Sequence, residues 1–423
     1  MLDINKIRAN KEGIKQALAK RADVKVIEKL LNSVLKLDEQ RRELIQKAEE
    51  LKAQRNKHSK SKPTPEIIAK MKKIGNDIKD ADQKLAKIEG EFTNAMAELP
   101  NIPADDVASG GKENNKVVDT VGLKPKFDFA PKDHTELATS LDIIDYERGA
   151  KMSGAGFWVY KGAGALLEWA LLNYFIEYHN KNGYTFIIPP FLLTEKSAYT
   201  SGHLPKFRDD LFWTQDKTCL NATSEMMLGN YHRDEILDES KLPYKYFAYS
   251  ACFRREAGSY RKEERGMIRG HQFNKVEIFQ FTKPADSWKA FDELVEIAEK
   301  LVDGLGLHFQ TTLLAAGDAS AAMAKTIDIE VWIPSMNIYK EVSSASNALD
   351  YQARRGNTRY KNSKTGKNEF VHTLNASGLA TSRLFPAILE QFQQADGSVL
   401  VPKPLQKFCG LKKIELKNKK LRK

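Results

Sequence analysis

The chain has 423 residues, of which 41% are hydrophobic and 29% charged, and its formal net charge is +11. This length suggests two or three domains, and the positive charge favours an anionic partner. The three cysteines, Cys219, Cys252 and Cys409, are too far apart for a zinc motif or a disulfide framework. The start MLDINKIRANKEG has no apolar signal core and no run of eighteen apolar residues occurs, so we expect a cytoplasmic protein with no membrane partner.

The first predicted element is a pair of long helices. Apolar residues recur at spacings of three and four in two series, which are Ile27, Leu30, Val34, Leu37, Leu44, Ala48 and Leu51, then Ile67, Met71, Ile74, Ile78, Ala81, Leu85, Ile88, Phe92, Ala95 and Leu99. Pro63 and Pro65 separate them, so we expect an antiparallel coiled-coil hairpin over residues 27–99, within a helical region 1–105. Each arm would be about 48 Å long. Its Lys and Arg residues suit a nucleic acid, although the pattern alone also allows an oligomerisation strut.

Residues 106–126 are predicted to be a linker, because they contain Gly110 and Gly111 and few apolar side chains. A second domain is expected over residues 127–423, ending in a basic tail. Its first segment, Ser153–Leu193, predicts a strand, a helix with one broad apolar stripe, and a second strand. The sequence NATSE (221–225) more readily predicts a helix cap than a ligand site.

The segment Tyr249–Phe281 predicts an antiparallel hairpin, since two alternating runs flank a basic, turn-rich middle. Side chains two apart share a face of a strand. The side chains that would share a face are Arg254 and Glu256 in the first run, and Phe273, Lys275 and Glu277 in the second. Arginine can neutralise a phosphate, an aromatic ring can stack on a base, and a carboxylate can bind an ammonium. This face therefore suits a nucleotide beside an amine, although a half-buried hairpin with solvent-facing charges is the alternative.

Three later segments complete the second domain. Trp288–Leu305 predicts an amphipathic helix, and Ile327–Arg355 predicts two strands and the start of a helix. Val371–Phe392 predicts a strand, a turn containing glycine, and a helix with Arg383 in its first turns.

Taken together, these segments resemble the class II aminoacyl-tRNA synthetases, and among them the seryl-tRNA synthetase family. Ser153–Pro190 resembles motif 1, FRREAG through HQFNKVEIFQF resembles motif 2, and GLATSRLFPAILE resembles motif 3. The seryl assignment rests on TSE at 223–225, EVSS at 341–344, NASGLA at 375–380 and the long N-terminal hairpin. The resemblance implies an α+β fold, in which the coiled-coil hairpin precedes a mostly antiparallel sheet flanked by helices.

The resemblance also implies an enzyme that uses ATP to activate L-serine and loads it on tRNA. ATP would be bound by residues that match motifs 2 and 3 and the EVSS segment, which are Arg254, Arg255, Glu256, Gly270, His271, Gln272, Phe273, Glu341, Val342, Ser343, Ser344 and Arg383. Arg254, Arg383 and Glu341 would carry the catalytic roles, and Glu341 with Ser344 would bind Mg²⁺. Serine would contact Thr223, Ser224, Glu225, Arg254, Glu277, Asn375 and Ser377.

The implied partners are tRNA(Ser), with tRNA(Sec) as a further candidate, and a second copy of the chain in a homodimer. The sequence departs from the family pattern at RKEE (261–264) in the motif 2 loop, and at Asn221, Ala345 and Ala376. These departures remove none of the charged groups named above. Two other functions stay open, which are a synthetase paralogue that loads a non-tRNA acceptor and a non-catalytic coiled-coil RNA-binding protein.

Overall fold

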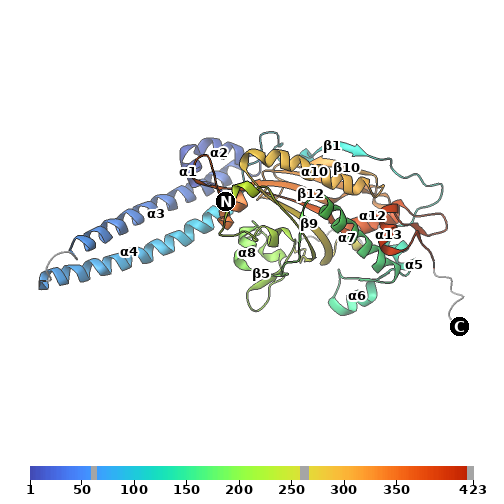
Figure 1. Ribbon diagram of the computed structural model, residues 1–423, viewed down its shortest axis with the longest axis horizontal. Coiled ribbons are helices and arrows are strands. Elements are labelled where there is room, and N and C mark those ends of the chain that lie inside the picture. The colour runs from blue at the N-terminus through green and yellow to red at the C-terminus, as the bar shows by residue number, and fades with distance from the viewer. Residues whose placement is uncertain (59–63, 258–265, 417–423) are drawn as a thin grey trace. The chain divides into compact units, whose positions relative to one another are not determined.

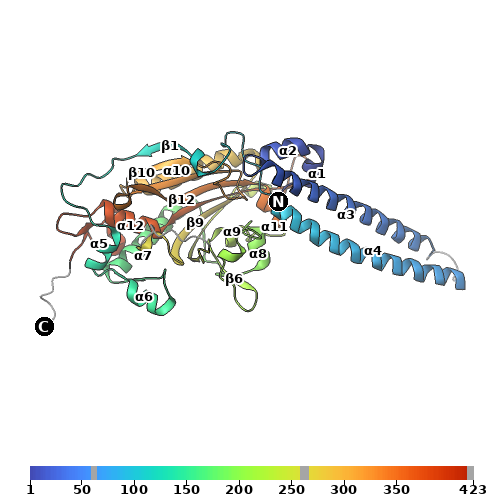
Figure 2. The ribbon, with the colours of Figure 1, turned by 180° about the vertical axis from the view of Figure 1, so that it is seen from behind.

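The computed structural model describes residues 1–58, 64–257 and 266–416, and Figures 1 and 2 show it from two opposite sides. The chain divides into two compact units, Met1–Ile102 and Pro103–Lys423. Three features of the sequence lie outside the described residues, which are Pro63, the RKEE segment and the end of the basic tail.

The first unit is the predicted helical hairpin, with two short helices before it. Its helices are α1 (Ile4–Ala9), α2 (Lys11–Leu18), α3 (Val24–His58) and α4 (Pro65–Glu98). α3 and α4 pack against each other, and each buries part of the predicted apolar series. Thr64 caps α4, since its hydroxyl accepts a hydrogen bond from the Ile67 amide at 3.3 Å. With 35 residues, α3 is about 52 Å long.

One position of the hairpin departs from the predicted heptad pattern. Asp38 is buried in α3, one residue beyond Leu37, which was expected to face the partner helix. Its carboxylate lies 3.4 Å from Arg8 of α1, 3.7 Å from Arg41 and 3.1 Å from Arg42. A buried carboxylate is tolerated when cations and hydrogen bonds surround it, and here these cations come from two helices.

The second unit is built on an eight-stranded sheet with the order β1-β10-β11-β12-β15-β9-β8-β4. The strands, in that order, are Lys116–Val121, Phe309–Leu313, Lys325–Ile333, Ile338–Leu349, His372–Ala380, Gln272–Thr282, Tyr244–Phe253 and Thr185–Ile187. All neighbours are antiparallel except β4 and β8, which run parallel. The predicted α+β fold is therefore confirmed.

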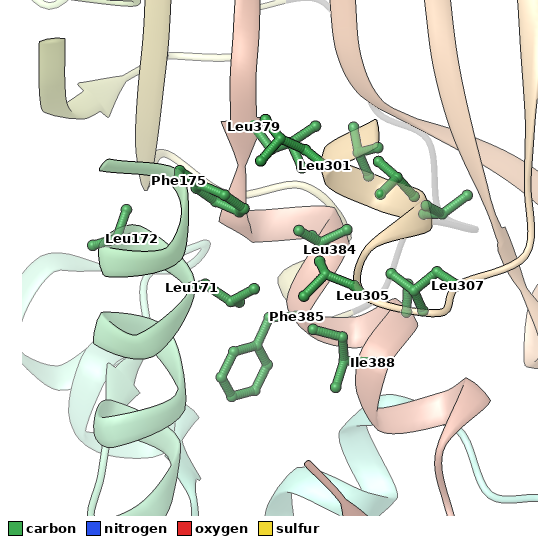
Figure 3. Packing of buried hydrophobic residues seen from close by; sticks show 14 of the residues in the cluster. Leu171, Leu172, Phe175, Leu301, Leu305, Leu307, Leu379, Leu384, Phe385 and Ile388 are labelled. Atoms are coloured by element: carbon green, nitrogen blue, oxygen red, sulfur yellow. The ribbon is translucent and has the colours of Figure 1, made fainter. Parts of the chain in front are cut away.

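Helices cover one face of this sheet and enclose the main core. They include α5 (His134–Ser140), α7 (Ala163–Lys181), α10 (Ser287–Asp303), α12 (Thr381–Gln391) and α13 (Lys403–Cys409). Figure 3 shows Leu171 and Phe175 of α7 beside Phe385 and Ile388 of α12. Val276 and Ile278 of β9 face this core, and Lys275 and Glu277 lie on the opposite face. On β15, Leu374 and Ala376 alternate in the same way with Asn375 and Ser377.

Shorter elements surround the sheet. They are α6 (Tyr146–Ser153), α8 (Glu195–Thr200), α9 (Glu225–Leu228), α11 (Tyr351–Gly356), and the strands β2 (Ile144–Asp145), β3 (Val159–Tyr160), β5 (Leu192–Thr194), β6 (Thr218–Leu220), β7 (Ile236–Leu237), β13 (Arg359–Lys361), β14 (Asn368–Phe370), β16 (Val399–Leu400) and β17 (Lys413–Ile414). Within the described residues, the helices are too short or too polar to cross a bilayer.

The structure corrects the prediction that residues 106–126 are a linker. Lys116–Val121 forms β1, which pairs with β10 and makes one end of the large sheet. The sequence does not show this strand as an apolar–polar alternation, because the side chains of an edge strand need little burial. Val117 and Val118 are accordingly exposed. Backbone hydrogen bonds to β10, rather than an apolar pattern, hold the segment in place.

The packing of α12 predicts a stability effect. Phe385→Ala removes a fully buried ring from the core beneath the sheet, and such truncations cost about 3–5 kcal/mol of unfolding free energy. Leu123→Ala is the matched control, because Leu123 is 91% exposed and its loss should change stability by less than about 0.5 kcal/mol. Urea unfolding followed by circular dichroism measures both, and equal midpoints for the two variants would contradict this account of the core.

Candidate active site

The candidate site is a hollow on the polar face of the large sheet. Lys275 and Glu277 of β9 and Asn375 and Ser377 of β15 point into it, away from the helix-covered core. The hollow has a volume of about 510 Å³. A second hollow of about 50 Å³ shares part of its wall, namely Arg254, Glu256, Arg269, Lys275, Glu341 and Ser377. The two hollows therefore form one continuous site.

A buried ammonium lies between polar groups of three segments. Lys275 Nζ is 2.5 Å from Glu277 Oε2 and donates a hydrogen bond to Thr223 Oγ1 at 2.6 Å. Asn375 Nδ2 donates to the other oxygen of Glu277 at 2.9 Å. Because both charges of this ion pair are buried, these neighbours are needed to offset the loss of water.

A second carboxylate, Glu225 at the start of α9, faces the same space. Gln352 Nε2 donates to its Oε1 at 2.7 Å. Burial, followed by the repulsion from Glu277, raises the pKa of Glu225 to about 7. The two carboxylates therefore share Lys275, and a cationic ligand group would stabilise the ionised form of both.

A neutral imidazole also lines this hollow. His203 Nδ1 is 2.9 Å from Ser201 Oγ, which itself donates to the Ala198 carbonyl, so the imidazole is the donor in the first contact. Burial, together with the charges of Arg254 and Lys275, lowers the pKa of His203 to about 3. His203 is therefore a neutral polar group at physiological pH.

Arg254 stands where the two hollows meet. Its guanidinium carbon is 5.2 Å from the centre of the Phe273 ring, and its Nε donates to the Ala222 carbonyl at 3.3 Å. β8 ends at Phe253, so Arg254 and Glu256 lie just beyond the strand and not on it as predicted. Glu256 has a φ of 51° and forms an ion pair with Arg269. A planar ligand on Phe273 would thus lie next to a cation that can bind phosphate.

The smaller hollow ends at a second arginine. Arg383, in the first turn of α12, donates from Nη1 to the Glu341 carbonyl at 2.9 Å and to Glu341 Oε2 at 3.2 Å. Its Nε donates to the Ile268 carbonyl at 3.4 Å. Arg383 is therefore held in place at this end of the site by contacts within the protein.

The oxygen groups on β12 fit a hard cation. Glu341 and Ser344 line the larger hollow, and Asp328 of β11 is paired with Ser344 in the strand register. Asp328 is buried, and its Oδ1 has no hydrogen-bond partner in the described part of the chain. No group of three or more His, Cys, Asp or Glu side chains in the described ranges is arranged to hold a metal alone. Two or three oxygens suit Mg²⁺, which keeps several water or phosphate ligands.

The structure brings together most of the predicted site residues. The larger hollow is lined by Thr223, Glu225, Arg254, Glu256, Glu277, Glu341, Ser344, Asn375 and Ser377, and the smaller adds Gly270, Phe273, Val342 and Arg383. The other five lie outside both hollows, namely Ser224, Arg255, His271, Gln272 and Ser343. Arg255 and Gln272 are exposed, whereas the Ser224 and Ser343 hydroxyls bond to Ser250 and to the Ser377 carbonyl.

Sequence reasoning gave no role to several residues of the site, among them His203, Arg269, Lys275 and Gln352. His203 lies in a loop without a periodic pattern, and Gln352 lies 127 positions from the carboxylate that it contacts. Lys275 was placed on the correct face of β9 with its neighbour Glu277, but its contact to Thr223 depends on a loop 52 positions away in the sequence.

An antiparallel sheet with arginines and carboxylates on its open face is the architecture of a class II synthetase core. Residues 207–392 match the family model described as "tRNA synthetase class II core domain (G, H, P, S and T)". Residues 1–103 match the "Seryl-tRNA synthetase N-terminal domain". The chain is 54% identical to "Serine--tRNA ligase 2" of Clostridium acetobutylicum, covering 98% of this chain and 100% of the relative. It is 44% identical to "Serine--tRNA ligase" of Chlorobaculum parvum at the same coverage.

Two solved structures match along nearly the whole chain. The seryl-tRNA synthetase from Pyrococcus horikoshii, complexed with ATP, has a TM-score of 0.91 at 32% identity, covering 99% of this chain and 100% of that one. The cytoplasmic serine-tRNA ligase from Naegleria fowleri, in complex with AMP, has a TM-score of 0.86 at 33% identity, covering 99% of both chains. The chain belongs to the seryl-tRNA synthetase family.

Proposed function

We propose that this protein is a serine–tRNA ligase that works in two steps in the cytoplasm. First, a carboxylate oxygen of L-serine attacks the α-phosphorus of ATP, the bond to the β-phosphate breaks, and pyrophosphate leaves. Next, the terminal 3′-hydroxyl of tRNA(Ser) attacks the carbonyl carbon of seryl-adenylate, loses its proton, and AMP leaves. The observation that carries this proposal is the single site in which Arg254 separates a carboxylate-lined pocket from a second hollow that ends at Arg383. tRNA(Sec) stays a predicted further substrate.

The nucleotide is assigned to the smaller hollow and the space beside it. Phe273 would stack on the adenine, and Glu256 would accept a hydrogen bond from its amino group. Arg254 would neutralise the α-phosphate as the phosphorus becomes pentacovalent, and Arg383 would bind the distal phosphates. Such catalysis depends on positioning and on charge stabilisation, and it requires no protein base.

Serine is assigned to the carboxylate-lined part of the larger hollow. Glu225 and Glu277 would bind its ammonium, which would add the second positive charge beside Lys275. Thr223, Asn375 and Ser377 would surround the hydroxyl. A pocket that hydrogen-bonds the substrate hydroxyl rejects the analogue without it by on the order of 10⁴, because its polar groups would be left unpaired. Alanine would therefore be discriminated against without a separate editing step.

We assign Mg²⁺ to Glu341 and Ser344, with Asp328 paired beside Ser344 on the neighbouring strand. When bound, the ion would neutralise negative charge on the phosphates. The chain's own contribution is to hold Glu341 in place through Arg383, which contacts both its carbonyl and its carboxylate.

We also propose a homodimer formed through the region Lys161–Pro190. Large apolar side chains are exposed along α7 and on and beside β4, namely Leu166, Trp169, Phe186 and Ile188. Exposed apolar patches of this kind typically mark protein–protein interfaces.

The hairpin α3–α4 is proposed to bind tRNA and not to serve as a strut. Within residues 55–58 and 64–73, five exposed cations, Arg55, Lys57, Lys70, Lys72 and Lys73, accompany one acidic residue, Glu66. This excess of positive charge at the far end of the hairpin suits a phosphate backbone. In the seryl family such an arm holds the long variable arm of the tRNA, so anticodon reading is unnecessary.

The active-site assignment predicts that Arg254→Ala and Arg383→Ala lower serine-dependent ATP–pyrophosphate exchange by roughly 100- to 1000-fold, because each removes a contact to developing negative charge. Arg148→Ala is the control, since Arg148 is exposed and belongs to neither hollow. Near-normal exchange in a folded Arg383→Ala variant would refute the assignment. A wild-type protein without any exchange would favour the non-catalytic alternative.

A pH dependence follows from the raised pKa of Glu225. The pKa of about 7 means that Glu225 becomes protonated, and thus loses its attraction for an ammonium, as the pH falls through neutrality. We expect the KM for serine to rise below pH 7, approaching about tenfold per pH unit. The KM for ATP should change much less over the same range, and Glu225→Gln should bind serine weakly with a flatter pH profile. A serine KM that is constant between pH 6 and pH 8 would contradict this role.

Removing residues 1–102 distinguishes a tRNA-binding role of the hairpin α3–α4 from a role as an oligomerisation strut. The small-molecule contacts all lie beyond residue 200, so serine-dependent exchange should survive and provides the internal control. Aminoacylation of tRNA should collapse, mainly through a higher KM for tRNA, and sedimentation should still show a dimer. If the shortened protein is monomeric but charges tRNA efficiently, the arm is a strut and the tRNA assignment is wrong.

A further inference from the structure

A buried carboxyl group on α7 has no part in the reaction described above. Glu168 is 3% exposed and lies among residues of β9 and α12. Its Oε1 accepts two hydrogen bonds, from Asn274 Nδ2 at 2.7 Å and from Thr381 Oγ1 at 2.6 Å. Among the described residues, no Lys, Arg or His forms an ion pair with it. A buried carboxylate without a cationic partner destabilises the folded protein, because burying an unpaired charge is costly. The presence of Glu168 at this position therefore calls for a functional explanation.

Both donors occupy key positions next to the nucleotide end of the site. Asn274 stands on β9 between Phe273 and Lys275, with its side chain on the face opposite to theirs. Its Oδ1 accepts a hydrogen bond from the Tyr249 hydroxyl at 3.1 Å, so both ends of the amide are held. Thr381 is the first residue of α12, two positions before Arg383.

The two hydrogen bonds leave the other carboxyl oxygen available for a proton. Within the parts of the chain that the structure describes, Glu168 Oε2 is buried and makes no hydrogen bond of normal geometry. The Tyr160 hydroxyl, which can donate or accept, also interacts with this carboxyl group. The titratable groups that face Glu168 are Tyr160 of β3 and Tyr249 of β8, and neither supplies a positive charge. Burial raises the pKa of Glu168 to about 7. A proton on Oε2 would remove the charge and leave both contacts of Oε1 intact.

We propose that Glu168 is a positioning residue for ATP, a carboxyl group that can take up a proton in the folded protein and that ties α7 to β9 and α12, which fixes Phe273 and Arg383 relative to each other. α7 and α12 also contact each other directly through the apolar residues labelled in Figure 3, among them Leu171 and Phe385. The inference rests on the proposed function, because it takes Phe273 and Arg383 as the groups that bind adenine and phosphate.

The kinetic test compares Glu168→Ala, Glu168→Gln and Thr381→Val in the full-length protein. Glu168→Ala should raise the KM for ATP in pyrophosphate exchange about tenfold, as expected for the loss of a buried hydrogen-bond network, with little change in the KM for serine. Glu168→Gln keeps an oxygen acceptor and should stay within about twofold of the wild type. The double variant Glu168→Ala/Thr381→Val should raise the KM for ATP by less than the product of the two single effects, because both changes remove the Thr381–Glu168 contact; Thr381 also reaches the Asn274 carbonyl at 3.1 Å.

Tyr184→Phe is the matched control for a purely structural effect. It removes a hydrogen bond of similar burial further along β9, from Gln280 Nε2 to the Tyr184 hydroxyl at 2.6 Å. Its melting temperature should fall without a change in the KM for ATP. If Glu168→Ala and Thr381→Val behave like Tyr184→Phe, the positioning role is refuted. If Arg383→Ala leaves exchange intact, the proposed function itself fails, so the two failures are distinguishable.

A second measurement tests the neutral state without using activity. Because the folded protein raises the pKa of Glu168 above its unfolded value, wild-type stability is lost as the pH rises towards 7. The glutamine side chain in Glu168→Gln does not titrate in this pH range, so it contributes no such pH dependence of stability. The melting temperature of Glu168→Gln relative to the wild type should therefore increase between pH 5 and pH 8. A difference that stays constant, or that decreases with pH, would mean that the carboxylate is ionised in the folded protein and would overturn the proposal.

Discussion

The two-residue alternation of β9 and β15 is the constraint on which the rest of the second unit depends. Val276 and Ile278 face the helix-covered core, whereas Lys275 and Glu277 face the hollow. A shift of the register by one residue would bury the charges beneath the helices and expose the apolar side chains. The same packing that stabilises the sheet therefore also fixes which chemical groups reach a ligand.

The electrostatic balance of the hollow fits the proposed binding of an amine next to a phosphate. On one side, two carboxylates share the single ammonium of Lys275, which leaves room for another cation. On the other side, Arg254 and Arg383 donate to main-chain carbonyls, and Arg383 also pairs with the Glu341 carboxylate. The negative carboxylates and the positive arginines therefore lie on opposite sides of one site. This arrangement fits an amino acid that binds on the carboxylate side and a nucleotide that binds on the arginine side.

How much could be predicted from the sequence depends on whether a feature is local. The heptads of α3 and α4 and the shared face of Phe273, Lys275 and Glu277 repeat along the chain, and both predictions agree with the structure. Asp38 broke the heptad rule because its partner Arg8 comes from another helix. His203 and Gln352 were missed for a related reason, since their roles depend on contacts between segments that no periodic pattern connects. The strand β1 was missed because it is held mainly by its backbone pairing with β10, and only Val121 at its end packs against the core.

The exposed strand β1 also bears on how the protein behaves in concentrated solution. It forms the outermost strand at its end of the large sheet, so among the described residues one row of its amide and carbonyl groups has no neighbouring strand. Val117 and Val118 add exposed apolar surface there, a combination that favours edge-to-edge aggregation. The irregularity in pairing between Val117 and Asp119 interrupts this edge, and Lys116 and Asp119 place charges along it. Solubility at this end of the sheet is thus protected by a bulge and two charged residues, independently of catalysis.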